Sequence, residues 1–203
     1  MMRVLIAGEG PDELGPLPPA EFVEGGRPSG GGAIEALLAK VRPTGWQVTA
    51  AMVWKDVRKL KPNAAGDGDA KTIAGLALHA KERGCHALVF LRDRDGSQAR
   101  ERVIRDAIAK ESQRGTRIAG GVPIEVLECW LLALKGETNA HTDANPVTSL
   151  EARYGVRRKH VSAMVQLIRT SRILATPPDA TSLWQWLRRV ATALRVTIPR
   201  EWH

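Results

Sequence analysis

The chain has 203 residues, of which 43% are hydrophobic and 26% are charged. This composition is typical of a globular protein and excludes an intrinsically disordered chain. The length is sufficient for one domain with a sizeable core plus an appendage, or for two small domains. The two cysteines, Cys85 and Cys129, lack the spacing of a zinc site. We therefore expect neither a disulfide nor a zinc centre.

The net charge of +8 is concentrated toward the C-terminal end of the chain. Residues 1–149 carry a net charge of +1, whereas residues 150–203 contain 10 lysines and arginines against 3 acids. A basic region of this kind predicts a polyanionic partner, most simply nucleic acid, with an acidic protein surface as the alternative. No apolar run has the length of a signal-peptide core or of a membrane-spanning helix, which predicts a cytoplasmic protein that does not enter a membrane.

Two short apolar runs each end just before acidic residues. The first, Val4–Ala7, precedes Glu9, and the second, Leu88–Leu91, precedes Asp93 and Asp95. Runs of this kind are typical of strands buried on both faces of a parallel sheet. Because ligands bind in the crevice outside the carboxyl ends of such strands, we expect these three acids to share one site. Converging carboxylates repel one another, and a divalent cation such as Mg²⁺ would stabilise them.

Further elements follow from the apolar periodicity of the remaining sequence. Strands are expected over residues 46–54 and 116–121, and helices over residues 33–41, 69–83, 96–115 and 124–134. Strands and helices thus alternate along the chain, which predicts a parallel sheet built from βαβ units. Asp69 is the expected N-cap of its helix.

Two segments interrupt this alternation. Residues 15–32 are rich in glycine and proline and predict a long loop, which could be a lid over the site or a disordered insertion. Residues 55–68 carry several basic side chains without an apolar stripe. They predict either a loop that contacts phosphate or a solvated run of charge.

The sequence becomes loop-like between residues 141 and 146, and the domain boundary is expected there. Residues 1–140 would form an α/β domain, and residues 141–203 a basic helical region. Apolar spacing within 161–168 and 183–194 predicts two amphipathic helices, which are too small to stand alone and would pack on the sheet domain or on a partner. The predicted fold is therefore α/β, a four-stranded and mainly parallel sheet flanked by helices, with a basic C-terminal helical appendage.

Three segments together resemble the signatures of the TOPRIM fold, which occurs in topoisomerases, primases and OLD-type nucleases. Gly8–Glu13 follows the first strand, Asp93–Asp95 follows a later one, and Ile124–Ala133 is similar to a Glu-x-Trp-Leu-Leu-Ala segment. That segment is found in an uncharacterised TOPRIM-like family encoded beside ATPase genes in bacterial defence loci. The resemblance covers about residues 1–135. The family has an acid just after the third segment, where this chain has Leu134-Lys135.

The resemblance implies a site for Mg²⁺ or Mn²⁺ built from Glu9, Asp93, Asp95 and Glu128. Asp93 and Asp95 would bind the metal directly or through water, and Glu9 would bind a second ion or orient the attacking water. Glu128 would complete the metal shell or, alternatively, is an exposed helix acid. The aspartates also have a structural alternative as turn and helix-cap residues.

Five basic residues are expected to contact nucleic acid. Arg92 and Arg94 flank the acids, where they would clamp a scissile phosphate or balance the carboxylates. Arg157, Arg158 and Lys159 form the densest basic cluster of the C-terminal region. This cluster would bind the phosphate backbone, and a solvated helix start is the alternative.

These features predict a metal-dependent nuclease subunit that acts in bacterial defence or DNA processing, together with a separate ATPase. Its substrate would be nucleic acid, with DNA favoured, and a homodimer is left open. The competing hypothesis is a nucleic-acid- or partner-binding protein that keeps the fold without catalysis, and the third is phosphoryl hydrolysis of a small nucleotide. Trp130, Trp184 and Trp186 are expected in the core or an interface rather than as stacking platforms for bases.

Overall fold

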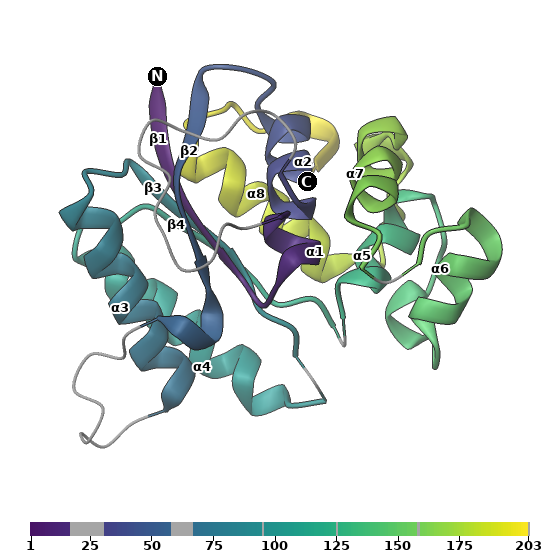
Figure 1. Ribbon diagram of the computed structural model, residues 1–203, viewed down its shortest axis with the longest axis horizontal. Helices are drawn as coiled ribbons and strands as arrows, with labels where there is room; N and C mark the ends of the chain where they lie inside the picture. Colours follow the sequence, from purple (N-terminus) through teal and green to yellow (C-terminus); the bar gives the residue numbers. More distant parts are fainter. Residues whose placement is uncertain (17–30, 58–66, 95, 125, 158, 203) are drawn as a thin grey trace.

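The computed structural model describes residues 1–16, 31–57, 67–94, 96–124, 126–157 and 159–202. The described strands form one sheet: β1 (Met2–Gly8), β2 (Trp46–Val53), β3 (Ala87–Leu91) and β4 (Ile118–Gly121). They are all parallel and lie in the order β2-β1-β3-β4, so that β1 and β3 are central (Figure 1). The predicted α/β fold with a four-stranded parallel sheet is confirmed.

Helices connect and cover these strands. The α-helices are α1 (Pro11–Leu14), α2 (Ala33–Val41), α3 (Gly68–Glu82), α4 (Gln98–Gln113), α5 (Leu127–Leu134), α6 (Pro146–Tyr154), α7 (Val161–Thr170) and α8 (Thr181–Ala193). Short 3₁₀ turns are η1 (Trp54–Asp56), η2 (Ala140–Thr142), η3 (Ile173–Ala175) and η4 (Arg200–Trp202). None of the helices within the described ranges is long and apolar enough to span a membrane.

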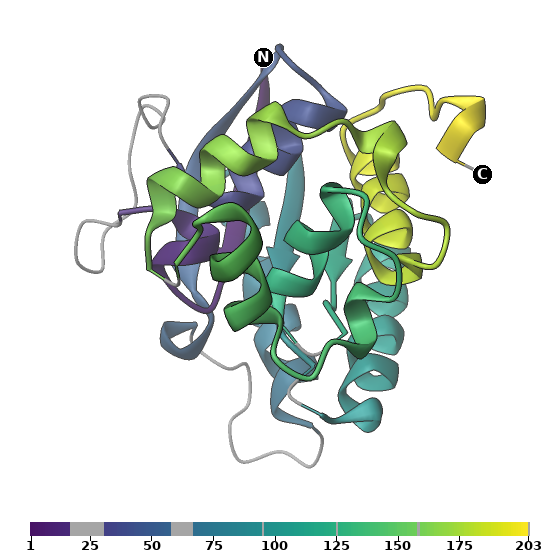
Figure 2. The ribbon, with the colours of Figure 1, turned by 90° about the vertical axis from the view of Figure 1, so that its right-hand side faces the viewer.

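The sheet has an apolar core on each face because successive side chains of a strand point to opposite sides. In β1, Val4 and Ile6 belong to one core and Leu5 and Ala7 to the other. Helices α3 and α4 cover the second of these faces, and α1, α2 and α8 cover the first (Figure 1). Helices α5, α6 and α7 lie farther out on that first side (Figure 2).

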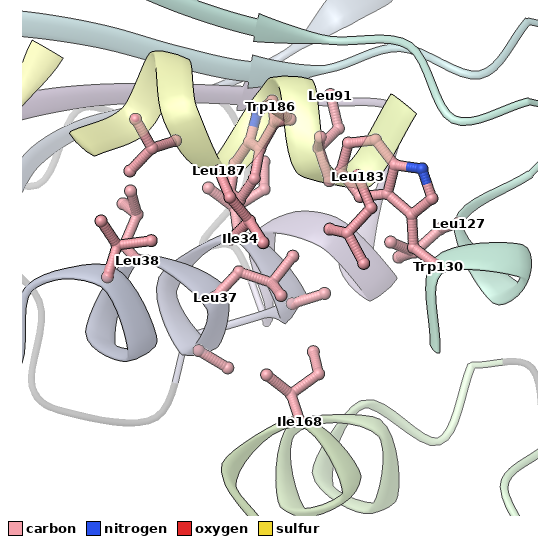
Figure 3. Packing of buried hydrophobic residues seen from close by; sticks show 14 of the residues in the cluster. Ile34, Leu37, Leu38, Leu91, Leu127, Trp130, Ile168, Leu183, Trp186 and Leu187 are labelled. Atoms are coloured by element: carbon pink, nitrogen blue, oxygen red, sulfur yellow. The ribbon is translucent and has the colours of Figure 1, made fainter. Parts of the chain in front are cut away.

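The larger core joins residues from both ends of the sequence. Ile34 and Leu37 of α2 pack with Leu187 and Trp186 of α8, and Ile168 of α7 closes the cluster from outside (Figure 3). All five side chains are fully buried. The core of the sheet domain is therefore completed by residues from the C-terminal region.

The basic C-terminal region forms part of the layered structure. Helix α8 packs on β4 and β3, and the indole Nε1 of Trp186 donates a hydrogen bond to the carbonyl oxygen of Phe90 at 3.3 Å. Helix α7 packs on α2. Trp130 and Trp186 are buried with their ring centroids 5.5 Å apart, as expected for core residues, and Trp184 is half-buried.

Several boundaries differ from the sequence prediction for local reasons. Helix α3 is capped by Asp67, whose carboxylate accepts a hydrogen bond from the Asp69 amide at 2.7 Å, so the prediction of Asp69 as the N-cap is wrong. Helix α5 begins at Leu127 rather than Ile124. Helix α6 is not predicted from the sequence, because proline usually marks a loop; here Pro146 occupies the first helical position, where proline is well tolerated.

Candidate functional site at the carboxyl edge of the sheet

The carboxyl ends of β1 and β3 lie side by side and bring together residues that are far apart in the sequence. Ala7 of β1 is paired with Phe90 of β3, and the chain continues from these partners to Glu9 and Arg92. The Glu9 carboxylate forms an ion pair with the Arg92 guanidinium and accepts a hydrogen bond from the Asp93 amide at 3.1 Å. The structure thus places Glu9 against Asp93, at the strand ends where the sequence predicts them.

A network of charged residues extends from Arg92 toward the helices on one face of the sheet. Asp69, in the first turn of α3, has a carboxylate oxygen 3.6 Å from Nε of Arg92 and accepts a hydrogen bond from Nε of Arg100 at 3.1 Å. Trp54 donates its indole N–H to Asp69 at 3.2 Å, and the Arg92 guanidinium lies 5.8 Å from the centre of the Trp54 ring. Arg100 also donates to the carbonyl oxygen of Asp93 at 2.9 Å.

This network fixes the backbone that carries Asp93. Arg92 connects the end of β3 to Glu9. Arg100 connects the same end of β3 to α3 and α4. Charge-assisted hydrogen bonds are roughly twice as strong as neutral ones, and a guanidinium can donate several at once. The loop after β3 is therefore held from both sides by arginines.

Glu13 is a second acid close after β1, in the short helix α1, and it is buried, with 8% of its surface exposed. Its carboxylate accepts a hydrogen bond from the Gly10 amide at 2.9 Å, which closes a capping box at the start of α1. Burial raises the pKa of Glu13 to about 7, although its backbone hydrogen bonds oppose the rise. A carboxyl group with this pKa can exchange a proton near neutral pH.

The pKa of Glu13 leads to a testable pH dependence of stability. Because the folded chain holds this proton up to about pH 7 and the unfolded chain loses it near 4.5, the folded state binds more protons in that interval. The free energy of unfolding should fall as pH rises through it, by at most about 3 kcal/mol. Glu13→Gln should remove this decline and stabilise the chain above pH 7, since glutamine also serves in a capping box.

Urea unfolding measured across this pH interval tests the prediction. Glu151→Gln is the matched control, since Glu151 is an acid on α6 whose side chain is 46% exposed and pairs with an arginine that does not titrate in this interval. The control should leave the wild-type pH profile unchanged. If the free energy of unfolding of Glu13→Gln still falls between pH 4.5 and 7, the pH dependence of stability comes from other groups.

The other predicted metal ligands fall into different settings. Glu128 is buried in the first turn of α5, with 5% of its surface exposed, so the alternative of an exposed helix acid is wrong. Asp95 lies outside the described residues. Among the residues that the structure describes, no three His, Cys, Asp or Glu side chains gather closely enough to hold a metal ion.

The donor atoms at the sheet edge nevertheless have the chemistry of a magnesium or manganese site. Glu9 and Asp93 offer carboxylate oxygens, and Mg²⁺ is commonly held by one or two carboxylates while it keeps waters and substrate phosphates as its remaining ligands. The Glu9 side chain is 33% exposed and therefore reachable from solvent. The Arg92 ion pair at Glu9 competes with a cation for this carboxylate.

The predicted nucleic-acid contacts are only partly close to this edge. The amide of Lys159 lies 3.4 Å from a carboxylate oxygen of Asp12 in α1, which brings the turn before α7 next to the loop after β1. Arg157 pairs with Glu151 at 2.7 Å, and its side chain is 67% exposed. The carbonyl oxygen of Arg94 accepts a hydrogen bond from Arg100 at 3.2 Å. Arg158 lies outside the described residues.

Sequence reasoning missed three members of the network, namely Trp54, Asp69 and Arg100. Each lies next to a strand or helix end, and Asp69 was assigned to a cap that Asp67 occupies. One signal was present: in parallel α/β sheets the starts of the following helices face the same edge as the strand ends. A polar residue in the first turn of α3 or α4 was therefore a candidate for the site.

Comparisons with known proteins give no further assignment. No protein-family model matches the chain, and no significant match is found among curated proteins or solved structures. The site is thus defined by the chain's own geometry, as a parallel-sheet edge at which Glu9 and Asp93 meet within an arginine network.

Proposed function

We propose that the chain is a Mg²⁺- or Mn²⁺-dependent nuclease subunit with a TOPRIM-like site at the carboxyl edge of its sheet. The observation that carries this proposal is the contact between Glu9 and Asp93, which follow neighbouring central strands and are 84 residues apart. Carboxylates at this edge are where an α/β sheet would hold a metal and a phosphodiester. The resemblance of the three sequence segments to TOPRIM supports the same conclusion.

In this proposal Glu9 and Asp93 hold the metal, with Asp95 as a further carboxylate ligand; Glu128, which the structure does not gather with Glu9 and Asp93, is left out of the metal shell. A bound divalent ion supplies a water of lowered pKa and stabilises charge on the phosphate oxygens. Arg92 keeps the Glu9 carboxylate beside the Asp93 amide, and Arg100 fixes the Asp93 backbone. Glu13, whose pKa is raised to about 7, lies in α1 four residues after Glu9 and can take up or release a proton there.

The basic turn that includes Arg157 and Lys159 supports nucleic acid as the substrate. Its Lys159 backbone lies against Asp12, next to the loop that carries Glu9. Lysine and arginine side chains beside a phosphodiester site provide affinity for the backbone of DNA or RNA that weakens with salt. A separate ATPase and a homodimer remain part of the proposal through the family resemblance alone.

A cleavage assay on supercoiled plasmid and labelled single strands, with Mg²⁺, Mn²⁺ or EDTA, tests the proposal. Asp93→Asn should lower metal-dependent cleavage by at least about a hundredfold, because removing groups that merely orient a metal ligand already costs about 10- to 100-fold. Asp106→Asn is the matched control, since Asp106 lies on α4 with its side chain 67% exposed. Equal activity in the two variants would contradict a metal site at Asp93.

A second candidate function is a binding protein of the same fold without catalysis. The charge balance at the edge favours it, because Arg92 pairs with Glu9 and Arg100 with Asp69. Carboxylates compensated in this way are stable without a cation. Under this alternative the wild type would bind nucleic acid without cutting it in either metal, alone or with an ATPase partner, and Asp93→Asn would bind as tightly as the wild type.

A further inference from the structure

A second polar site lies at the opposite end of the sheet, where β4 begins. A pocket of about 520 Å³ opens between the C-terminal ends of α4 and α8. It is lined by four arginines, three residues with hydroxyl groups, two apolar residues and one glycine, and much of its exposed lining is apolar: Arg117, Arg188, Arg189, Arg195, Ser112, Thr116, Thr192, Ile118, Ala193 and Gly115. The volume is within the usual range of about 300–1,000 Å³ for ligand sites.

The positive charge of this pocket is poorly compensated by the chain. No carboxylate lines it, and within the described part of the chain Arg117, Arg188 and Arg195 have no ion pair. The C-terminal ends of α4 and α8 each contribute roughly half a negative charge. Together they offset about one of the four guanidinium charges.

One arginine has a different role. Arg189 donates a hydrogen bond to the carbonyl oxygen of Gly120 at 2.9 Å, and so covers the open edge of β4. Burial lowers the pKa of Arg189. We therefore assign it to the sheet edge and leave it out of the tests below, since replacing it would disturb the fold.

The backbone at Arg195 provides an independent observation. Helix α8 ends in a Schellman motif, in which the amide of Val196 donates to Ala191 and the amide of Arg195 donates to Thr192. Arg195 occupies the left-handed position of this motif with φ 56°. Glycine is the usual residue there, and a larger side chain costs roughly 1 kcal/mol. Arginine thus occupies the rim of the pocket at a position where the backbone favours glycine.

We propose that this pocket binds a phosphate-bearing ligand of nucleotide size, with the phosphate held by Arg117, Arg188 and Arg195. Arginine binds phosphate oxygens in a bidentate manner, and hydroxyl groups such as those of Thr116 and Thr192 add hydrogen bonds. The phosphate could belong to a free nucleotide or to a nucleic-acid strand. This site is separate from Glu9 and Asp93 and does not depend on the proposed metal chemistry.

Binding in EDTA tests the proposal without contribution from a metal site. The probes are ATP and pyrophosphate in calorimetry, and a fluorescent single-stranded oligonucleotide in anisotropy. The double substitution Arg188→Gln/Arg195→Gln should raise the Kd of each probe that binds at least tenfold. The control Arg102→Gln/Arg169→Gln removes the same charge from exposed positions on α4 and α7 and should change affinity less than twofold.

Saturable binding of ATP or pyrophosphate would identify a free nucleotide as the source of the phosphate, and binding of the oligonucleotide alone would identify a strand. The proposal is overturned if no probe binds, or if the control pair weakens binding as much as the pocket pair. Arg195→Gly separates binding from folding, because it should raise the melting temperature of the protein and still weaken its affinity for the probe. A variant that is stabilised but binds with full affinity would also overturn the role of Arg195.

Discussion

Trp186→Ala should lower the free energy of unfolding by about 4 kcal/mol, the range typical of a tryptophan removed from a core. Trp186 is fully buried, packs against Trp130 and donates to the carbonyl oxygen of Phe90. The fit is close, because a Cβ on Gly121 would lie 2.2 Å from Cδ1 of this indole. Its removal leaves a cavity under β3 and β4 that small shifts cannot fill.

Urea unfolding measures this effect as a shift of roughly 2 M in the midpoint, for a slope of about 2 kcal/mol/M. Trp184→Ala is the matched control on the same helix, because Trp184 is half-buried and donates to the carbonyl oxygen of Pro177 at 3.0 Å. Its loss should be less than half as large. A loss below about 1 kcal/mol for Trp186→Ala would mean that α8 does not stabilise the sheet.

Arg92→Met should lower the free energy of unfolding by about 2 kcal/mol, between the cost of breaking an exposed ion pair and that of breaking a buried one, because this pair is partly buried. The Arg92 and Asp69 side chains are each 16% exposed, and Arg92 lies between Asp69 and Glu9. Methionine keeps much of the apolar stem, so the loss reports the guanidinium. The expected value stays below that of a fully buried pair because Glu9 is 33% exposed and Asp69 keeps its hydrogen bond from Arg100.

Arg157→Met provides the control for this substitution. Its ion pair with Glu151 is exposed and should contribute about 0–1 kcal/mol. The proposed metal site adds a second readout, because Arg92 competes for the Glu9 carboxylate. Saturating Mg²⁺ or Mn²⁺ should therefore stabilise Arg92→Met more than the wild type. Equal stabilisation of both proteins by the metal would argue against a cation at Glu9. A small loss of unfolding free energy in Arg92→Met without metal would mean that burial does not strengthen this ion pair.

Much of the fold follows from local sequence patterns. Helix α2 has the predicted bounds 33–41, since its apolar face is regular and Pro43 prevents continuation. Strand β3 and residues 4–8 of β1 are apolar because both of their faces are buried. The errors come from competing short-range signals. Two aspartates, Asp67 and Asp69, flank one glycine, and periodicity does not decide which of them caps α3.

The candidate site is less visible in the sequence than the fold. Glu9 and Asp93 could be predicted together because the rule for parallel strand ends joins them. Their partners could not, since the contact of Asp69 with Arg100 depends on how α3 and α4 pack. The position of Glu13 likewise depends on the distant helices α2 and α7, which pack against α1. The arginine pocket combines residues of α4, the start of β4 and α8, which no single motif contains.

The contribution of α8 to the larger core also orders the events of synthesis. The face of the sheet covered by α3 and α4 is complete once residue 122 has left the ribosome, whereas the opposite face waits for residues 181–193. During that interval the apolar side chains of β3 and β4 that α8 will cover remain open to water or to other chains. During synthesis the chain thus passes through a stage in which one face of the sheet is covered by helices and the other face still exposes apolar side chains. Chaperone binding would be most useful at that stage.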